Sequence, residues 1–428
     1  MKRLNIAIIG LGNIGCYLFN YLKDNKKILT EKNNCLPIVK YVSAKNKKKK
    51  RNIKIDEKQW LKNYLDATKI KDVDLIVELI GGAEGPAKKL VFNALKNKKH
   101  VVTANKALIA KYGDQLAKIA EKNKVNLEFE ASVCGGVPII RSLKEGLIAN
   151  KISKIYGIFN GTSNYILSSM DKQNKNFEDV LLDAKKLGYA ESNPSSDLNG
   201  DDVSSKLKIL SSLCFNSFLN NKIYVEGIKN IDKTDIDNAN KLGYKIKLLG
   251  FAELLNNKIY QRVHPTLIKK DTYVASIDGV LNAVIIDGKP VGKSIIQGEG
   301  AGPAATTSAL VSDISSILRG NIKFPFSLSS KERKKLTFDN ISDRFFSAYL
   351  RFEVIDKPGV LSNITNIFSK NKVSIKRLIQ NPHKNKKISS IIIITHDSKD
   401  KSLNKILKQV AKKNYVYNKP KLIRINNS

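Results

Sequence analysis

The sequence predicts an α/β protein in three parts: a doubly wound parallel sheet, an α+β part, and a C-terminal βαββαβ unit. The 428 residues are too many for a single core of ordinary size. Apolar strand-like runs alternate with helical patterns through about residue 135, which is typical of a parallel sheet covered by helices. A segment rich in Ser and Lys precedes the last part. We therefore expect domains at 1–135, 136–302 and 346–428, a helix at 303–320 that returns to the first domain, and a linker at 321–345.

The first predicted strand ends in a glycine-rich turn. The run Leu4–Ile9 is apolar, and Gly10, Leu11, Gly12, Asn13, Ile14 and Gly15 follow it before a helical pattern begins. Between a strand and a helix, this spacing is typical of a Rossmann-type dinucleotide site, because Gly12 lets the backbone approach a pyrophosphate and the helix N-terminus donates N–H groups to it. The alternative is a tight turn without a ligand. We expect the turn to bind a cofactor.

The end of the second predicted strand, 38–42, bears on the choice of cofactor. An enzyme strict for NAD places Asp or Glu there, whereas this chain has Ser43, Ala44 and Lys45. This favours NADP, or tolerance of it. The neighbouring basic run 47–51 is interpreted as a solvated loop, with phosphate binding as the second interpretation.

The rest of the predicted parallel sheet has strands at 74–80, 100–104 and 126–131 and helices at 87–95 and 107–122. Lys106 follows a strand's carboxyl end, where ligands of open parallel sheets bind, although a surface role is the alternative. Cys134 stands in the turn 132–138 as either a thiol nucleophile or a small structural residue, and no His is near it in sequence. Glu130 precedes that turn and could coordinate a hard cation through oxygen.

Two polar segments mark the second domain, which begins with a helix at 139–148 and a strand at 152–159. Asn160, Gly161 and Thr162 form an elbow before a helix, suited to binding polar parts of a ligand. In 188–206 the basic character reverses: no Lys or Arg occurs from 187 to 205, but four acids do, Glu191, Asp197, Asp201 and Asp202. Asp202 and Lys206 are four residues apart, so they project from one side of the predicted helix. A capped helix start with a surface ion pair is the alternative.

The remaining pattern completes the α+β and βαββαβ parts. Strands are expected at 223–228, 258–264 and 281–287, a helix at 236–249, and a helix at 305–319 opened by the turn 298–302. The last part has expected strands at 347–354, 373–380, 389–396 and 421–425 and helices at 360–371 and 403–412.

Composition excludes several classes of function. The formal net charge of +36 comes from Lys scattered along the whole chain, and the one dense run lacks aromatic residues for base stacking, so we expect no specific nucleic-acid partner. No apolar run approaches the ~18 residues of a membrane span. The four Cys form neither a metal-site spacing nor a disulfide framework, which suits a reduced, cytoplasmic compartment.

Seven ordered blocks resemble homoserine dehydrogenase of the three-domain bacterial type. They are GLGNIG at 10–15, VELIGG at 77–82, VVTANK at 101–106, FEASVCGGVP at 129–138, FNGTSNYIL at 159–167, GYAESNPSSDLNGDDVSSK at 188–206 and GEGAG at 298–302. The last part resembles an ACT domain through YLRFEVIDKPGVL at 349–361. The resemblance departs at Asn193, where the family usually has Asp, at Cys134, where it usually has Ala, and at Pro303, which comes earlier than the family's proline.

The resemblance implies reversible reduction of aspartate 4-semialdehyde to homoserine, in threonine, methionine and isoleucine biosynthesis. It makes Lys206 the proton donor, with Lys106 beside the reacting oxygen. The implied substrate residues are Glu191, Asp197, Asp202, Asn160, Gly161 and Thr162. The implied NAD(P) residues are Gly10, Gly12, Asn13, Ile14, Gly15, Lys45, Lys106 and Gly302. Glu130 and the carbonyls of Val133, Gly135 and Val137 match a monovalent cation site, expected to hold Na⁺.

The resemblance to an ACT domain also implies regulation and assembly. Such domains bind amino acids between paired modules, so we expect a homodimer or homotetramer and feedback inhibition by threonine. The expected regulatory residues are Asp356, Gly359, Val360 and Leu361. Two other functions remain alternatives: an aspartate-semialdehyde dehydrogenase that uses Cys134 as its nucleophile, and a dinucleotide-sensing regulator.

Overall fold

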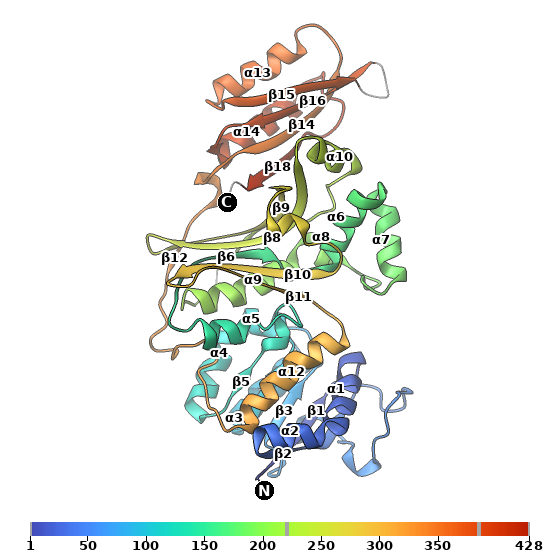
Figure 1. The fold of residues 1–428 in the computed structure, drawn as a ribbon, viewed down its shortest axis with the longest axis vertical. Helices are drawn as coiled ribbons and strands as arrows, with labels where there is room; N and C mark the ends of the chain where they lie inside the picture. The colour runs from blue at the N-terminus through green and yellow to red at the C-terminus, as the bar shows by residue number, and fades with distance from the viewer. Residues whose placement is uncertain (1, 219–221, 383–386, 427–428) are drawn as a thin grey trace.

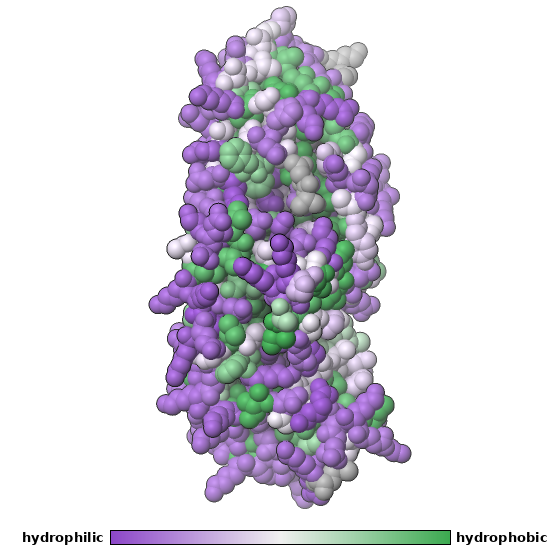
Figure 2. Space-filling model, turned by 60° about the vertical axis from the view of Figure 1, so that its left-hand side comes forward, coloured by the Kyte–Doolittle hydropathy of each residue, from purple (hydrophilic) through white to green (hydrophobic). Residues whose placement is uncertain are grey.

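The computed structural model describes residues 2–218, 222–382 and 387–426. Figure 1 shows an elongated molecule with a parallel sheet at one end, a mixed sheet in the middle and a smaller α/β unit at the other end. Within the described residues, no helix combines the length and the apolar character needed to cross a bilayer. Hydrophilic residues are spread over the full length of the face in Figure 2, as the scattered lysines predict.

The N-terminal sheet is parallel, with strand order β2-β1-β3-β4-β5, and confirms the predicted fold class. Its strands are β1 (Lys2–Ile9), β2 (Cys35–Ser43), β3 (Leu75–Glu78), β4 (His100–Thr103) and β5 (Leu127–Glu128). The covering helices are α1 (Asn13–Asp24), α2 (Lys26–Asn33), α3 (Pro86–Lys96), α4 (Lys106–Asn123) and α12 (Pro303–Leu318). Although it comes from far along the chain, α12 packs against α1 and shares the core of β1.

The expected strand 126–131 is shorter than predicted. Residues Glu130–Ser132 form a 3₁₀ turn instead. The N–H of Glu130 donates to the carboxylate of Asp313 on α12 at 2.9 Å, so it is not available to a strand ladder. The chain thereby leaves the sheet and enters the loop that leads to the second part.

The middle of the molecule is a mixed sheet with helices against one face. Its strands are β6 (Lys151–Ile158), β7 (Tyr224–Val225), β8 (Tyr244–Leu255), β9 (Lys258–Lys269), β10 (Leu281–Lys289) and β11 (Gly292–Glu299). The helices are α5 (Ile139–Arg141), α6 (Gly161–Gln173), α7 (Phe177–Lys186), α8 (Ser195–Asn199), α9 (Asp201–Cys214), α10 (Lys233–Lys241) and α11 (Tyr273–Ser276). The buried apolar face of α9 packs on β6 and β8.

The predicted helix 236–249 is wrong in its second half. Helix α10 ends at Lys241, Gly243 adopts a positive φ of 83°, and Tyr244–Leu255 is strand β8. All twelve residues of β8 pair with β9, so tertiary pairing outweighed the local helical pattern.

Three other predicted elements of the middle part also differ from the structure. The helix 139–148 is α5 followed by a π-helical turn at Ser142–Gly146, the strand 223–228 is only β7, and β11 was not predicted.

The C-terminal unit has the predicted βαββαβ order. It contains β14 (Ala348–Ile355), α13 (Val360–Lys370), β15 (Ile375–Pro382), β16 (Ile388–Thr395), α14 (Asp400–Ala411) and β18 (Lys421–Asn426). The pairs β12 (Thr337–Phe338) with β9 and β13 (Phe345–Phe346) with β17 (Ser398–Lys399) are small additions. Strand β18 pairs with β14 on one side and with β9 on the other, so the C-terminal sheet continues the middle sheet. The sequence did not predict this continuity.

A buried ion-pair network joins β14 to the middle part. Arg351 of β14 is 4% exposed, and its Nε lies 2.8 Å from the carboxylate of Asp235 on α10. The same guanidinium contacts Asp232 at 2.5 Å and also pairs with Glu353. Since Asp235 is fully buried, removal of the arginine would leave an uncompensated charge inside the protein.

We therefore expect Arg351→Met to lower the free energy of unfolding by about 3–5 kcal/mol. Urea unfolding followed by circular dichroism measures the change. Arg377→Met on β15 is the matched control, because Arg377 is exposed. Equal stability of the two variants would contradict the structural role of the network.

Candidate active site

A single buried carboxylate joins the two lysines that the sequence singled out. Asp202 lies in the first turn of α9 and is 3% exposed. Its Oδ2 lies 2.8 Å from Nζ of Lys206, one helical turn later, and its Oδ1 lies 2.5 Å from Nζ of Lys106. The ion pair is therefore buried at the junction of two sheets, so the surface alternative for Asp202 and Lys206 is wrong.

Lys106 reaches Asp202 because the end of β4 is held in a fixed turn. Asn105 caps α4 by accepting from Leu108 N–H at 3.1 Å, and its Nδ2 donates to the carbonyl of Gly82 at 2.8 Å. The hydroxyl of Thr103 donates to the buried carboxylate of Glu78, which also accepts from the backbone after β3. The ends of β3 and β4 are thus tied together, and Lys106 begins the helix that leaves them.

Asn160 brings a second acid beside Asp202. Its Nδ2 donates to Asp197 Oδ1 at 2.7 Å and to Asp202 Oδ2 at 2.9 Å, while its Oδ1 caps α6 by accepting from Ser163 N–H. Gly161 passes close to the start of β10: a Cβ there would lie 2.6 Å from the carbonyl oxygen of Val280. Thr162 donates to the carbonyl of Tyr189 at 2.7 Å, which ties the elbow to the acidic segment.

The charges decide the protonation of this group. Burial alone would raise the pKa of Asp202, but the charges of Lys206 and Lys106 outweigh it and hold that pKa far below its usual range. Burial would lower the pKa of Lys206, yet the negative charge of Asp202 raises it above the usual lysine value. Burial and the nearby Asp202 raise the pKa of Asp197. Lys206 is therefore an ammonium at neutral pH.

The Lys206 ammonium keeps one N–H for a ligand. Asp202 takes one of its three donors, and the carbonyl of Phe159 accepts a second at 2.6 Å. Both acceptors are backbone or buried groups that hold the side chain in one orientation. The third donor can be directed to an oxygen of a bound molecule, and the ammonium can release its proton there.

Two members of the acidic segment lie apart from this cluster. Glu191 is exposed, and no ion pair links it to another described residue. Asn193 is also exposed, and its Oδ1 accepts from the hydroxyl of Ser195 at 2.6 Å and from its N–H at 3.3 Å. Asn193 therefore stabilises the turn before α8, a task that does not require the charge of an Asp.

The glycine turn has the shape expected of a dinucleotide site. Gly15 packs on the preceding strand, since a Cβ there would lie 2.1 Å from the carbonyl oxygen of Gly10. Gly12 caps α1, and a Cβ there would meet no described atom within 4 Å. Asn13 and Ile14 open the helix, so their N–H groups have no partner within it. The turn thus presents backbone donors along an open cradle that fits a pyrophosphate.

Arg51, the last residue of the basic run 47–51, contacts this turn, and the sequence did not predict that contact. Its Nε donates to the carbonyl of Leu11 at 3.0 Å, and its guanidinium stacks 5.7 Å from the centre of the Trp60 ring. Lys45 lies two residues after the end of β2, and its side chain is exposed. Residues 45–50 are exposed, as predicted for a solvated loop, and Arg51 is the residue of the run that contacts the glycine turn. The signal in the sequence was the one arginine that ends a run of lysines.

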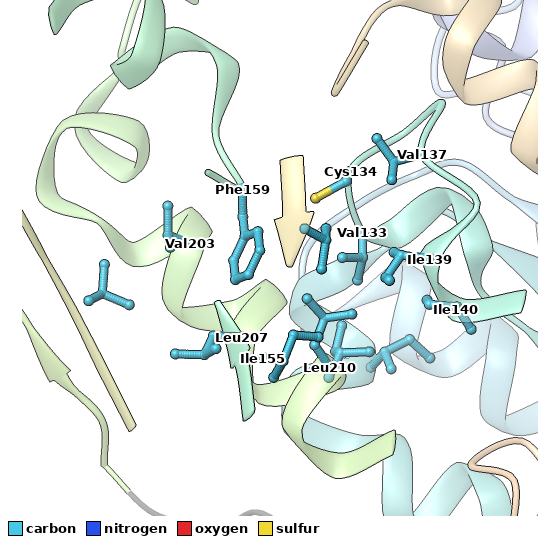
Figure 3. Close-up of a cluster of buried hydrophobic side chains, with 14 of the residues drawn as sticks. Val133, Cys134, Val137, Ile139, Ile140, Ile155, Phe159, Val203, Leu207 and Leu210 are labelled. Carbon is cyan, nitrogen blue, oxygen red and sulfur yellow. The ribbon is translucent and has the colours of Figure 1, made fainter. Parts of the chain in front are cut away.

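Cys134 lies among hydrophobic side chains. Figure 3 shows its sulfur in a cluster with Phe159, Val133 and residues of α9. It is 1% exposed, and burial raises the pKa of its thiol to about 11. An inaccessible, protonated thiol is a poor nucleophile, so the structural interpretation is favoured.

The turn 298–302 packs against the loop that contains Cys134. Gly136 N–H donates to the carbonyl of Glu299 at 2.9 Å. Gly302 caps α12 with φ of 104°, and Pro303 occupies the first turn of that helix, where proline is well tolerated. The early proline thus fits the helix start.

At the expected cation site, some of the oxygen ligands already accept hydrogen bonds from the protein. The Glu130 carboxylate accepts from the N–H groups of Ile140 at 2.9 Å and Arg141 at 2.6 Å, and the Val137 carbonyl accepts from Ile139 at 2.7 Å. Burial raises the pKa of Glu130 to about 7, a destabilised carboxylate that a cation would relieve. Among the described residues, no group of three or more His, Cys, Asp and Glu could hold a metal.

The expected regulatory residues surround a cavity of about 340 Å³ in the C-terminal unit. Asp356, Gly359, Val360 and Leu361 line it together with Gln380 of β15. Gly359 caps α13 with φ of 87°, so the first N–H groups of that helix border the cavity. A carboxylate, an amide and helix donors in one small cavity suit a polar ligand of amino-acid size.

Comparison with known proteins gives one family over almost the whole chain. Residues 138–315 match the family model described as homoserine dehydrogenase, residues 10–130 match that of the homoserine dehydrogenase NAD binding domain, and residues 348–413 match an ACT domain. A homoserine dehydrogenase of Neisseria gonorrhoeae is 39% identical over 94% of each chain. One of Helicobacter pylori is 38% identical over 100% of each chain.

Solved structures agree with this grouping. The crystal structure of a homoserine dehydrogenase from Thiobacillus denitrificans has a TM-score of 0.92 at 36% identity and covers 100% of this chain and 99% of that chain. A homoserine dehydrogenase of S. aureus has a TM-score of 0.77 at 33% identity and covers 100% of both chains.

The two glycines of the turn give a matched prediction. Gly12→Ala should change the free energy of unfolding by less than about 1 kcal/mol and weaken binding of NADPH, because the added methyl enters the open cradle. Gly15→Ala should destabilise the protein by about 1–3 kcal/mol or more, because its methyl would overlap Gly10. Thermal unfolding and NADPH fluorescence measure both effects. A Gly15→Ala protein as stable as the wild type would contradict the close approach of Gly15 to the carbonyl of Gly10.

Proposed function

Because this chain belongs to the homoserine dehydrogenase family, whose members are NAD(P)-dependent oxidoreductases acting on a CH–OH group, we propose that it interconverts aspartate 4-semialdehyde and homoserine. The observation that carries the proposal is the pair of lysines on Asp202. Two lysines on one carboxylate, at the edge of the parallel sheet where the glycine turn also lies, suit a reaction in which negative charge develops on a carbonyl oxygen.

In this proposal, each residue of the cluster has a defined task. The nicotinamide cofactor supplies the hydride when bound. Lys206 donates the proton to the developing alkoxide, and Lys106 stabilises its charge. Asp202 keeps Lys206 protonated, and Asn160 with Asp197 forms the polar wall for the substrate's amino acid end. Glu191, on the exposed segment, would have to approach when substrate binds.

NADP is the cofactor that we propose, held by the glycine turn, Lys45, Lys106 and Gly302. No acid follows β2, and both Lys45 and Arg51 lie on the loop after it, which suits a 2′-phosphate. Comparing the turnover rates with NADP and NAD tests this preference, and faster turnover with NAD would contradict it.

A monovalent cation, Na⁺, is proposed at Glu130 with the carbonyls of Val133, Gly135 and Val137. The destabilised carboxylate supports it, whereas the hydrogen bond already accepted by Val137 reduces the number of free ligands. Replacing NaCl by choline chloride should lower the melting temperature of the protein but not that of Glu130→Gln.

Aspartate-semialdehyde dehydrogenase loses support, because the buried thiol of Cys134 is unsuited to covalent catalysis. The dinucleotide-sensing regulator does not require the pair of lysines on Asp202. We further propose that the protein assembles as a homodimer or homotetramer, acts in threonine and methionine biosynthesis, and is inhibited by threonine bound in the cavity at Asp356.

The central experiment follows nicotinamide absorbance with homoserine and NADP. We expect turnover with the wild-type protein and a loss of about 10²–10⁴-fold in Lys206→Met. Lys208→Met is the matched control, since Lys208 lies on the same helix but faces another cavity. The absence of turnover with either cofactor would refute the proposal.

Asp202 should control the pH range of the reduction. With Asp202 present, the raised pKa of Lys206 keeps the donor protonated beyond the ordinary lysine range. In Asp202→Asn the charge that raises this pKa is gone and burial lowers it, so the rate should begin to fall at lower pH. Profiles of kcat/KM for Asp202→Asn and for Asp201→Asn, an exposed neighbour, test the shift. Identical profiles would show that Asp202 does not set the proton affinity.

Threonine should raise the melting temperature and slow turnover of the wild-type protein. Asp356→Asn should lose both responses while its uninhibited rate stays unchanged, because Asp356 lines the C-terminal cavity, apart from the catalytic cluster. Asp343→Asn, an exposed acid before β13, should respond like the wild type. An active enzyme indifferent to millimolar threonine would contradict the regulatory role.

A further inference from the structure

Arg262 of β9 is a buried cation held by aromatic rings. It is 6% exposed, and its guanidinium carbon lies 4.5 Å from the ring centre of Phe251 and 4.6 Å from that of Phe346. Tyr260 forms a third wall at 5.6 Å. Cation–π contacts of this kind stabilise and orient a guanidinium, but they do not neutralise its charge.

No ion pair of the described residues includes Arg262, and the charge of Glu253, which raises the pKa of Arg262, offsets only part of the effect of burial. Its Nη1 is buried and has no hydrogen-bond partner in that part of the chain. Neighbouring arginines differ: Arg424 lies 2.7 Å from Asp400, and Arg344 lies 2.9 Å from Asp339. A buried, unpaired charge is costly, so its retention needs a reason.

The guanidinium lines a cavity of about 290 Å³ at the junction of the middle and C-terminal sheets. Lys154 of β6 and Arg344 before β13 add positive charge to its wall. Two acids also line the cavity. The carboxylate of Glu253 is 3.4 Å from Arg344 and 3.9 Å from Lys154, and that of Asp397 accepts from the hydroxyl of Ser347 at 2.7 Å. The volume is at the lower end for small-molecule sites, so it suits a small ligand.

We propose that this cavity, the junction cavity, binds a small anion through a carboxylate or phosphate group that pairs with Arg262. The planar guanidinium presents donors that match either group, and the aromatic walls shield the pair from water. Burial lowers the pKa of Arg262, and a bound anion would reverse that effect. The cavity is separate from the threonine cavity, whose lining residues it does not share.

The site is placed to affect the catalytic helix. Val263 follows Arg262 on β9 and points to the opposite face, where a Cβ on Gly200, the N-cap of α9, would lie 3.2 Å from it. Gly200 directly precedes the turn that holds Asp202. Strand β9 therefore lies between the anion site on one face and the start of α9 on the other.

Calorimetric titration of the full-length protein, saturated with NADP to fill the glycine turn, tests the site. Inorganic phosphate is titrated in one arm and acetate in the other, at constant ionic strength maintained with chloride. We expect one of the two to bind, and Arg262→Gln to weaken that binding at least tenfold. Lys151→Gln on the exposed start of β6 removes the same charge outside the cavity and should leave binding unchanged.

Three outcomes would overturn the proposal. They are binding of neither anion to the wild type, equal affinities in wild type and Arg262→Gln, and equal losses in Arg262→Gln and Lys151→Gln. Equal affinities together with a change of oligomeric state in Arg262→Gln would assign the guanidinium to a contact with a second copy. If Arg262→Gln does not fold, the anion affinity of Arg344→Gln, at the cavity wall, is measured instead. An affinity equal to that of the wild type would contradict the proposed anion site. Binding is the readout, so the result is independent of the proposed reaction.

Discussion

The buried carboxylate of Asp202 is the constraint on which the arrangement of this protein depends. A carboxylate that is 3% exposed is stable only if its charge is paired, and its two partners come from different parts of the molecule. Lys206 lies on the same helix as Asp202, but Lys106 is the first residue of α4, shortly after β4. The N-terminal and middle parts must therefore dock with fixed geometry before the site exists.

That docking combines close contacts of glycine-rich backbone with a shared core of apolar side chains from α4 and α9. A Cβ on Gly135 would lie 2.7 Å from the carbonyl oxygen of Gly300, so two loops from separate parts of the chain touch directly. The loop with Gly300 continues into α12, which packs on α1 and the N-terminal core. The chain thus crosses the junction three times: before α5, before α12, and between α12 and β12, which pairs with β9.

Local features of the sequence predicted much of the fold and the centre of the site. The strand–glycine–helix pattern and the spacing of Asp202 and Lys206 are encoded within a few residues, so they could be read directly. The strand β8 could not, since its pairing with β9 overrides a helical pattern. The contacts of Arg51, Arg262 and Arg351 were not predicted for the same reason: their partners lie on other elements, and only the fold brings them together.

The acids also determine the direction in which the pKa of Lys206 is shifted, which the spacing of the residues in the sequence does not. Two convergent lysines repel each other and could lower each other's pKa toward neutrality, but Asp202 lies between them and raises that of Lys206 instead. Asp197 shares the cluster through Asn160 and adds further negative charge. In the proposed reaction, an ammonium with a high pKa still donates readily to an alkoxide, which is far more basic.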